Sequence, residues 1–145
     1  MTEPQSLLFV DDDSDDTFLF REILAEVNPS LLFTSAVNGE DALQKLTAPG
    51  ALLPQLIFMD LNMPRMGGKE CVSAIKGHDN LKHIPVIMYT TSSYAKDKEE
   101  ALQAGATYYI TKPSSYKELK ETLLIVAKNL TDLPKAFEML NSQLV

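Results

Sequence analysis

The stretch LIFMDLNMPRMGG, residues 56–68, decides the fold of this chain. It opens with four apolar residues, and such a run is typical of a strand that is buried on both faces. Asp60 follows directly, and Pro64 cannot continue an interior strand because proline has no N–H to donate. Asp60 is therefore expected at the carboxyl end of a buried strand, the edge where open α/β sheets bind ligands. Taken alone, the pattern fits equally well an aspartate that only caps a turn.

Composition and charge restrict the class of protein. The 145 residues suit a single domain, and their net charge of −7 argues against a nucleic-acid binder, which needs a basic face. The N-terminal residues have no signal-peptide pattern, and no apolar run is long enough for a membrane span. The single cysteine, Cys71, excludes an internal disulfide framework and fits a reducing compartment. We therefore expect a cytoplasmic protein that binds neither nucleic acid nor membrane.

Strand-like runs and helical patterns alternate five times along the chain. The runs lie at residues 7–10, 31–36, 56–59, 86–89 and 107–110, each followed by a helical pattern. This alternation predicts an α/β protein with a flavodoxin-like, doubly wound, five-stranded parallel sheet, strand order 2-1-3-4-5, and helices on both faces. We expect a domain over residues 1–130 and a C-terminal tail extension over 131–145, without an effector domain. The tail is expected to form a helical turn or two after Pro134.

The first predicted helix follows a run of acids. Asp13 or Ser14 can cap it, and Asp15 and Asp16 suit its first turn, where the helix dipole favours anions. Three- and four-residue spacing predicts an inner face formed by Phe18, Leu19, Ile23, Leu24 and Val27.

Polar side chains follow the strands that a 2-1-3-4-5 sheet places side by side. Asp11 and Asp12 follow the first strand, Asp60 the third, Thr90 the fourth and Lys112 the fifth. Three neighbouring carboxylates stay ionised only when a cation balances them, and oxygen ligands without His or Cys favour Mg²⁺ or Mn²⁺. An ionised aspartate is a nucleophile for phosphorus, and a lysine and a hydroxyl can hold phosphoryl oxygens. The sequence therefore predicts phosphoryl transfer to Asp60.

The chain resembles the receiver domain of two-component response regulators from about Leu7 to Lys128. The motifs that carry the resemblance are separate and occur in the family's order: Asp11-Asp12, Asp60 in MDLNMP with Gly67, Thr90 after PVIMY, Tyr109, and Lys112-Pro113. The stretches IKGHDNLKHIPVIMYTTSS and YYITKP look most like stand-alone receivers paired with bacterial phytochrome kinases.

The resemblance implies a role for each residue. Asp60 would accept the phosphoryl group from a sensor histidine kinase. Asp12, Asp60 and the backbone carbonyl of Asn62 would bind Mg²⁺, with Asp11 acting through a water. Lys112 would contact the phosphoryl group, and its bond to Pro113 would be cis. The resemblance also implies a switch pair, Thr90 and Tyr109, and two positions that tune hydrolysis, Asn62 and Ser92.

The output is expected to be a protein–protein contact with an unidentified target. Thr90 leads into the fourth helix and Tyr109 lies on the fifth strand, so the face of the fourth helix, fifth strand and fifth helix is expected to carry the signal. A homodimer through complementary charge is one expected form of this output. The alternative for this face is an ordinary solvated surface. The tail offers a further apolar set, formed by Leu133, Phe137, Met139 and Leu140.

The sequence also bears on alternatives to a regulator with a dedicated target. A phosphorelay shuttle or phosphate sink is as compatible with these residues as a regulator with a dedicated target. A carboxylate-nucleophile phosphatase would want an acid two residues after Asp60, where Asn62 stands, so the chain is not expected to be an enzyme beyond its own phosphorylation and dephosphorylation. A flavodoxin would want a phosphate-binding loop where the acids at 11–16 stand. His78 and His83 are read as surface residues away from the site.

Overall fold

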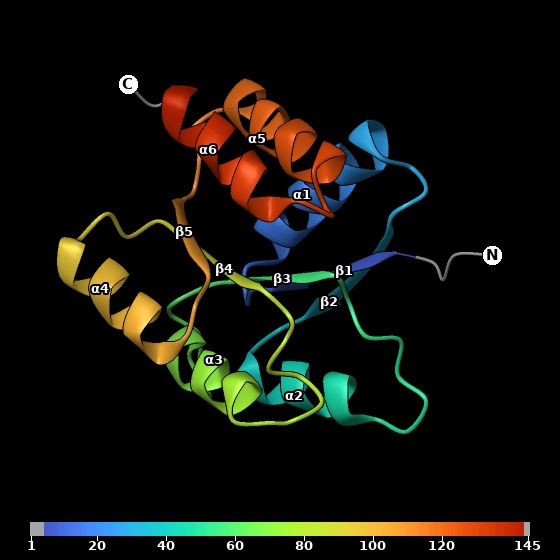
Figure 1. Cartoon of the computed structure of the whole chain (residues 1–145), viewed down its shortest axis with the longest axis vertical. Coiled ribbons are helices and arrows are strands. Elements are labelled where there is room, and N and C mark those ends of the chain that lie inside the picture. Colours follow the sequence, from blue (N-terminus) through green and yellow to red (C-terminus); the bar gives the residue numbers. More distant parts are fainter. Residues whose placement is uncertain (1–4, 144–145) are drawn as a thin grey trace.

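The computed structural model describes residues 5–143 and contains the predicted parallel sheet (Figure 1). Its strands are β1 (Ser6–Val10), β2 (Leu32–Ala36), β3 (Leu56–Met59), β4 (Val86–Thr90) and β5 (Tyr108–Thr111). All neighbouring strands run parallel, in the order β2-β1-β3-β4-β5. The predicted strand order is confirmed, and it makes β1 and β3 neighbours although a strand and two helices separate them along the chain.

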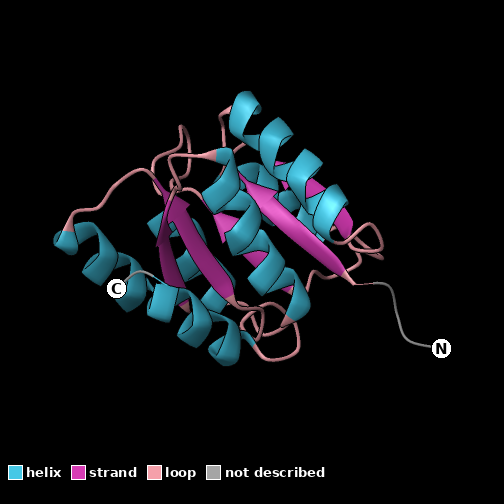
Figure 2. Cartoon of the chain, turned by 90° about the horizontal axis from the view of Figure 1, so that it is seen from above, coloured by secondary structure: helices cyan, strands magenta, loops and turns pink. Residues whose placement is uncertain are grey.

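Helices cover both faces of the sheet. They are α1 (Ser14–Val27), α2 (Gly39–Thr47), α3 (Gly68–Lys76), α4 (Ala95–Ala104), α5 (Tyr116–Lys128) and α6 (Leu133–Gln143). In Figure 1, α1, α5 and α6 lie above the sheet, whereas α2, α3 and α4 lie below it; Figure 2 shows the layers from above. Within residues 5–143, no helix combines the length and the apolar character that a membrane span requires.

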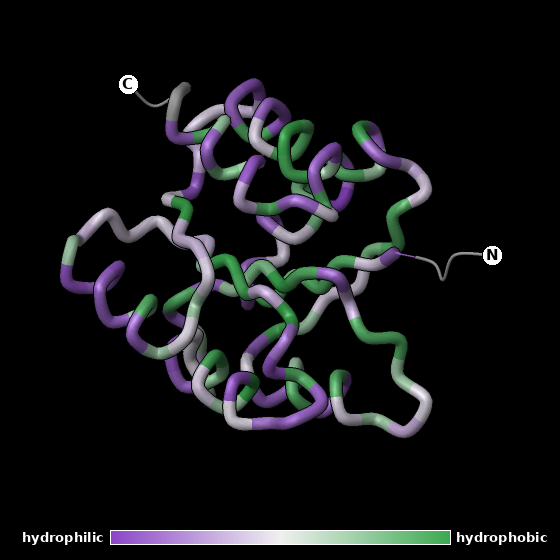
Figure 3. Tube along the Cα trace, viewed as in Figure 1, coloured by the Kyte–Doolittle hydropathy of each residue, from purple (hydrophilic) through white to green (hydrophobic). Residues whose placement is uncertain are grey.

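The strands divide their side chains between two cores, because successive residues of a strand point to opposite faces. Leu7 and Phe9 of β1 enter the core under α1, α5 and α6. Leu8 and Val10 enter the core on the other face. The apolar colour of the central strands in Figure 3 reflects this burial on both sides. The same alternation continues past the strand ends, so it also decides to which face each site residue points.

Helix α1 starts as predicted but presents a different face to the sheet. Asp13 is its N-cap and accepts the backbone N–H groups of Asp15 and Asp16. Its buried residues are Phe20, Ile23 and Leu24, and the Phe9 and Phe20 ring centroids lie 4.3 Å apart. The prediction that Phe18 and Leu19 belong to the inner face is wrong, since their exposed fractions are 60% and 39%. Phe20 also precedes Ile23 and Leu24 by three and four residues, so the sequence contains two overlapping apolar stripes.

The segment after residue 130 is part of the packed structure. α6 is an 11-residue helix, longer than the one or two turns expected, and the Asp132 side chain accepts the backbone N–H of Lys135 near its start. Its Phe137 ring stacks on Tyr108 of β5 with centroids 3.8 Å apart and ring planes 2° from parallel. Leu133, Ala136 and Leu140 are buried in the same core, so of the predicted apolar set Met139 is the exposed member.

Replacing Phe137 by alanine is expected to destabilise the whole protein. The change removes a buried ring between α6 and β5, and we expect a loss of about 3 kcal/mol in the free energy of unfolding, measured with urea. Glu138→Ala, an exposed change on the same helix, is the control and is expected to stay within about 0.5 kcal/mol. Equal effects of the two variants would mean that α6 does not stabilise the domain.

Candidate functional site

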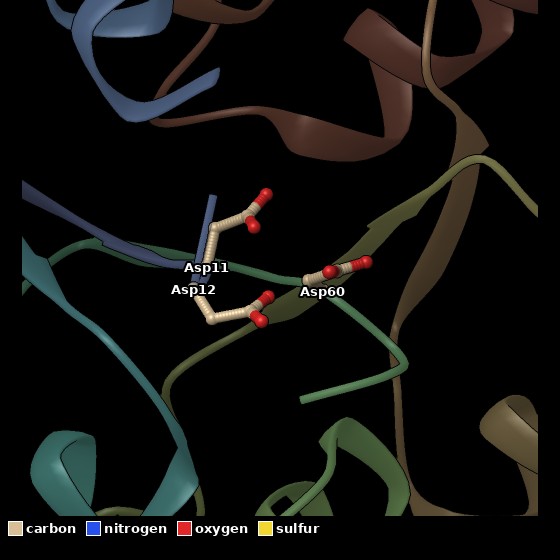
Figure 4. Close-up of side chains that lie close together, drawn as sticks. All are labelled: Asp11, Asp12 and Asp60. Carbon is tan, nitrogen blue, oxygen red and sulfur yellow. The ribbon is translucent and has the colours of Figure 1, made fainter. Parts of the chain in front are cut away.

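Three carboxylates meet at the carboxyl edge of the sheet. Asp11 and Asp12 follow β1 and Asp60 follows β3, and each offers an oxygen within 4.8 Å of the others. Figure 4 shows Asp11 and Asp12 at the end of β1, one above the other, with the Asp12 carboxylate directed toward Asp60. Asp11 and Asp60 are 2% and 9% exposed, whereas Asp12 is exposed. The structure therefore brings together the acids that the sequence singled out.

Burial makes the negative charge of this cluster unfavourable. Burial and, to a smaller extent, the nearby Asp11 charge together raise the pKa of Asp60 from 3.8 to about 6, against the opposing effects of Lys112, the Leu61 N–H and the Thr90 hydroxyl. Burial also raises the pKa of Asp11. A divalent cation would relieve this repulsion, and three oxygen ligands suit Mg²⁺ or Mn²⁺. Asn62 is exposed two residues beyond Asp60, and binding through its carbonyl stays a prediction.

Lys112 extends from the end of β5 into the same site. Its Nζ lies 2.9 Å from Asp11 Oδ2 and 2.7 Å from Asp16 Oδ2 of α1. Burial disfavours the ammonium, but the hydrogen bonds to Asp11 and Asp16 outweigh this effect and raise the pKa of Lys112. From the sequence, Asp16 was expected only in the first turn of α1, and its contact with Lys112 was missed.

The predicted cis bond between Lys112 and Pro113 is wrong, since all peptide bonds of the described residues are trans. A cis bond is not needed to turn the Lys112 side chain over the site. The trans chain does so, because the Lys112 backbone N–H donates to the Thr90 carbonyl at 2.7 Å and fixes the residue beside β4. From there the long side chain reaches Asp11.

The predicted switch residues are joined by hydrogen bonds. Thr90 is 1% exposed, and its hydroxyl lies near enough to the Asp60 carboxyl to lower the pKa of that group. Thr90 Oγ1 also accepts the backbone N–H of Ser92 at 3.4 Å, and the Ser92 carbonyl accepts the Tyr109 hydroxyl at 2.8 Å. The Ser92 hydroxyl itself donates to Asp97 of α4 at 2.6 Å. The loop after β4 thus connects Asp60 with β5 and with α4.

The loop after Asp60 depends on a glycine for its close approach to the strand. The Gly68 N–H donates to the Leu61 carbonyl at 2.8 Å, which folds residues 61–68 back onto the end of β3. A Cβ at Gly68 would collide with the Asp60 carbonyl oxygen and with the Met88 side chain. The chain can therefore begin α3 directly beside the site only with glycine at this position.

The comparison with known families agrees with this geometry. The model of the response regulator receiver domain family matches residues 7–124. The chain belongs to this family. The receiver domain is 33% identical to the polar-differentiation response regulator DivK of Brucella anthropi over 120 residues, which cover 83% of this chain and 94% of DivK.

Solved structures of receivers are similar to it as well. The phosphorylated cyanobacterial phytochrome response regulator RcpA matches with a TM-score of 0.82 and 26% identity, covering 90% of this chain and 96% of RcpA. The Mn²⁺-bound form of response regulator Rcp1 matches with a TM-score of 0.76 and 29% identity, covering 85% and 91% of the two chains.

The two histidines lie elsewhere in the receiver domain. His78 and His83 line a hollow of about 550 Å³ beside the loop that joins α2 to β3, together with Leu46, Leu53 and Leu81. The backbone N–H of Asn80 donates to His78 Nδ1 at 3.2 Å. Neither histidine belongs to the acid cluster.

The raised pKa of Asp60 predicts how the stability of the metal-free protein depends on pH. Below pH 3.8 the carboxyl is protonated in both the folded and unfolded states. Between pH 4 and 6 the unfolded state ionises first, so stability falls as pH rises, and above pH 6 the full penalty of about 3 kcal/mol applies.

We therefore expect Asp60→Asn to stabilise the metal-free protein at pH 7.5 by about 2 to 3 kcal/mol and to have little effect at pH 4. Urea unfolding in the presence of EDTA measures both values. Adding Mg²⁺ should stabilise the wild type and leave Asp60→Asn nearly unchanged. A variant that is less stable than the wild type at pH 7.5 would contradict the electrostatic origin of the effect.

Proposed function

We propose that this receiver accepts a phosphoryl group on Asp60 from the phosphohistidine of a sensor histidine kinase and passes the signal to a protein partner. The observation that carries the proposal is the meeting of Asp60 with two further acids, the Thr90 hydroxyl and the Lys112 ammonium at one edge of the sheet. No part of this arrangement is needed to hold a sheet together, and burial of the acids costs stability. Phosphoryl transfer to Asp60 explains why these residues lie together.

The transfer itself needs an ionised nucleophile. One Asp60 carboxylate oxygen forms a bond to phosphorus while the bond from phosphorus to the donor imidazole breaks, and the imidazole takes up a proton as it leaves. Because the pKa of Asp60 is about 6, most of the carboxyl groups are ionised at neutral pH. The Thr90 hydroxyl, which already contacts this carboxylate, is placed to donate to a phosphoryl oxygen, and Lys112 supplies a positive charge.

A divalent cation would be held by Asp11, Asp12 and Asp60, with the Asn62 carbonyl as a further ligand. When bound, Mg²⁺ would supply the positive charge that balances these acids and the phosphoryl oxygens. The Mn²⁺-bound structure of the similar regulator Rcp1 supports this choice of ion. The likeness to RcpA, a phytochrome response regulator, supports a kinase of the phytochrome type as the donor. The protein would act in the cytoplasm.

Labelling with a small phosphoryl donor tests the proposal. Incubation with acetyl phosphate and Mg²⁺ should add one phosphoryl group, which peptide mass spectrometry should place on Asp60. EDTA is expected to abolish labelling, since the acid cluster then lacks its balancing charge. Equal labelling of Asp60→Asn, or labelling that ignores EDTA, would refute the assignment.

For the output we propose the face formed by α4, β5 and α5, with α6 as an added wall. A cavity of about 630 Å³ lies over β5 and is lined by Tyr109, Pro113, Glu121, Phe137 and Leu140 among other residues. Tyr109 is joined to Asp60 through Ser92 and Thr90, so a change at Asp60 would reach this face first. Part of the charge of this face is already paired within the protein, because Lys69 of α3 forms ion pairs with Asp97 and Glu100 of α4.

Self-association is the expected readout of this face. Light scattering with beryllofluoride, a phosphoryl mimic, should give a higher mass than without it, and Thr90→Ala should reduce the response because the hydroxyl that reports on Asp60 is lost. The change in free energy need be only about 2 kcal/mol to bias a near-balanced equilibrium. An unchanged mass together with unchanged hydrogen exchange over α4, β5 and α5 would place the output elsewhere.

A further inference from the structure

Lys112 contacts two carboxylates, and one of them, that of Asp16, has so far been given no role in the site. Asp16 Oδ2 lies 2.7 Å from Lys112 Nζ, and Asp11 Oδ2 lies 2.9 Å from the same atom. The Lys112 side chain is 12% exposed and the Asp16 side chain 37% exposed. Lys112 Nζ also lies 5.6 Å from the centroid of the Tyr89 ring. The ammonium therefore has a defined position before any phosphoryl group is present.

The fold places these groups on one side of the sheet. Phe9, Phe58, Tyr89 and Ile110 pack against the α1 and α5 side. Asp11 follows Phe9, Asp60 follows Phe58 and Lys112 follows Ile110, in each case by two residues. These three side chains therefore point to that same side, because side chains alternate along a strand. Asp13 is the N-cap of α1, so Asp16 lies in the first turn of this helix, beside Lys112.

The ammonium has three N–H donors, and the two carboxylates occupy two of them. A phosphoryl group on Asp60 adds oxygen acceptors that compete for the same ammonium. The two carboxylates differ in how easily they can release it. Asp11 has a side chain only 1% exposed and would be left as a buried charge, whereas Asp16 is partly exposed and can be solvated by water. The Asp16 bond is thus the one that can yield.

We propose that Asp16 is a positioning residue that holds Lys112 in the unphosphorylated protein and competes with the phosphoryl group on Asp60 for its ammonium. The inference rests on the proposed function, since it requires Lys112 to contact a group on Asp60. It assigns Asp16 a role in setting how readily Asp60 is loaded, separate from metal binding by Asp11, Asp12 and Asp60.

The test compares Asp16→Asn with Asp15→Asn. Both variants remove one negative charge from the first turn of α1, but the Asp15 side chain is exposed and lies outside the contacts of Lys112. Calorimetry with saturating Mg²⁺ measures the affinity for beryllofluoride. We expect Asp16→Asn to bind it roughly fivefold more tightly than Asp15→Asn, the scale of a partly exposed charge-assisted contact.

Two further measurements separate positioning from a general structural effect. The affinity for Mg²⁺ alone should change equally in the two variants, because Asp16 is not one of the acids that meet. Asp16→Glu, which restores a carboxylate, should bring the beryllofluoride affinity back toward that of the wild type. In the unaltered protein, the nitrogen resonance of the Lys112 ammonium should move when beryllofluoride is added.

The outcomes distinguish the inference from the proposed function. If the wild type binds beryllofluoride but Asp16→Asn binds it no more tightly than Asp15→Asn, the competition is refuted and the phosphoacceptor role of Asp60 stands. Weaker binding in Asp16→Asn would also refute competition, because it would mean that Asp16 helps Lys112 to reach the phosphoryl group. If the wild type itself binds no beryllofluoride, the proposed function and this inference both fail.

Discussion

Repulsion among three carboxylates that the fold holds together is the constraint on which the site depends. Asp11, Asp12 and Asp60 stand within 4.8 Å of one another at the end of two neighbouring strands, and burial raises the pKa of both Asp11 and Asp60. Lys112 offsets part of this charge, but it is shared between Asp11 and Asp16. The folded protein therefore retains an excess of negative charge that a divalent cation can balance and that a phosphoryl group with its cation would rearrange.

A series of contacts connects the acid cluster with the surface formed by α4 and β5. The Asp60 carboxylate contacts the Thr90 hydroxyl, and the loop after β4 contacts Tyr109 of β5 through the Ser92 carbonyl. The Ser92 hydroxyl contacts Asp97 of α4. Under the proposed function, a phosphoryl group on Asp60 would alter the partners of Thr90 first and would then move this loop. α6 covers β5 on the other side through the stack of Phe137 on Tyr108, so the face that would respond has one wall fixed to the core.

Much of this arrangement could be predicted from the sequence. The alternating apolar runs predicted the strand order, and the acids, threonine and lysine at the strand ends predicted which side chains would meet. The sequence could not decide the rotation of α1 about its axis, because Leu19 and Phe20 each precede an apolar residue by three or four positions. That rotation decides that Asp16 points to Lys112, a contact between residues 96 positions apart. The cis bond at Pro113 was predicted from the family pattern, yet the trans chain brings Lys112 to the site.

The central claim is that the acid cluster at the ends of β1 and β3 is completed by one divalent cation. Paramagnetic broadening of backbone amide resonances by trace Mn²⁺ tests it most directly. The account predicts strong, saturable broadening around residues 11–12 and 60–62, which excess Mg²⁺ reverses and which Asp60→Asn weakens. Broadening that is spread over the exposed acids of α4 and α5, or that Asp60→Asn leaves unchanged, would contradict it.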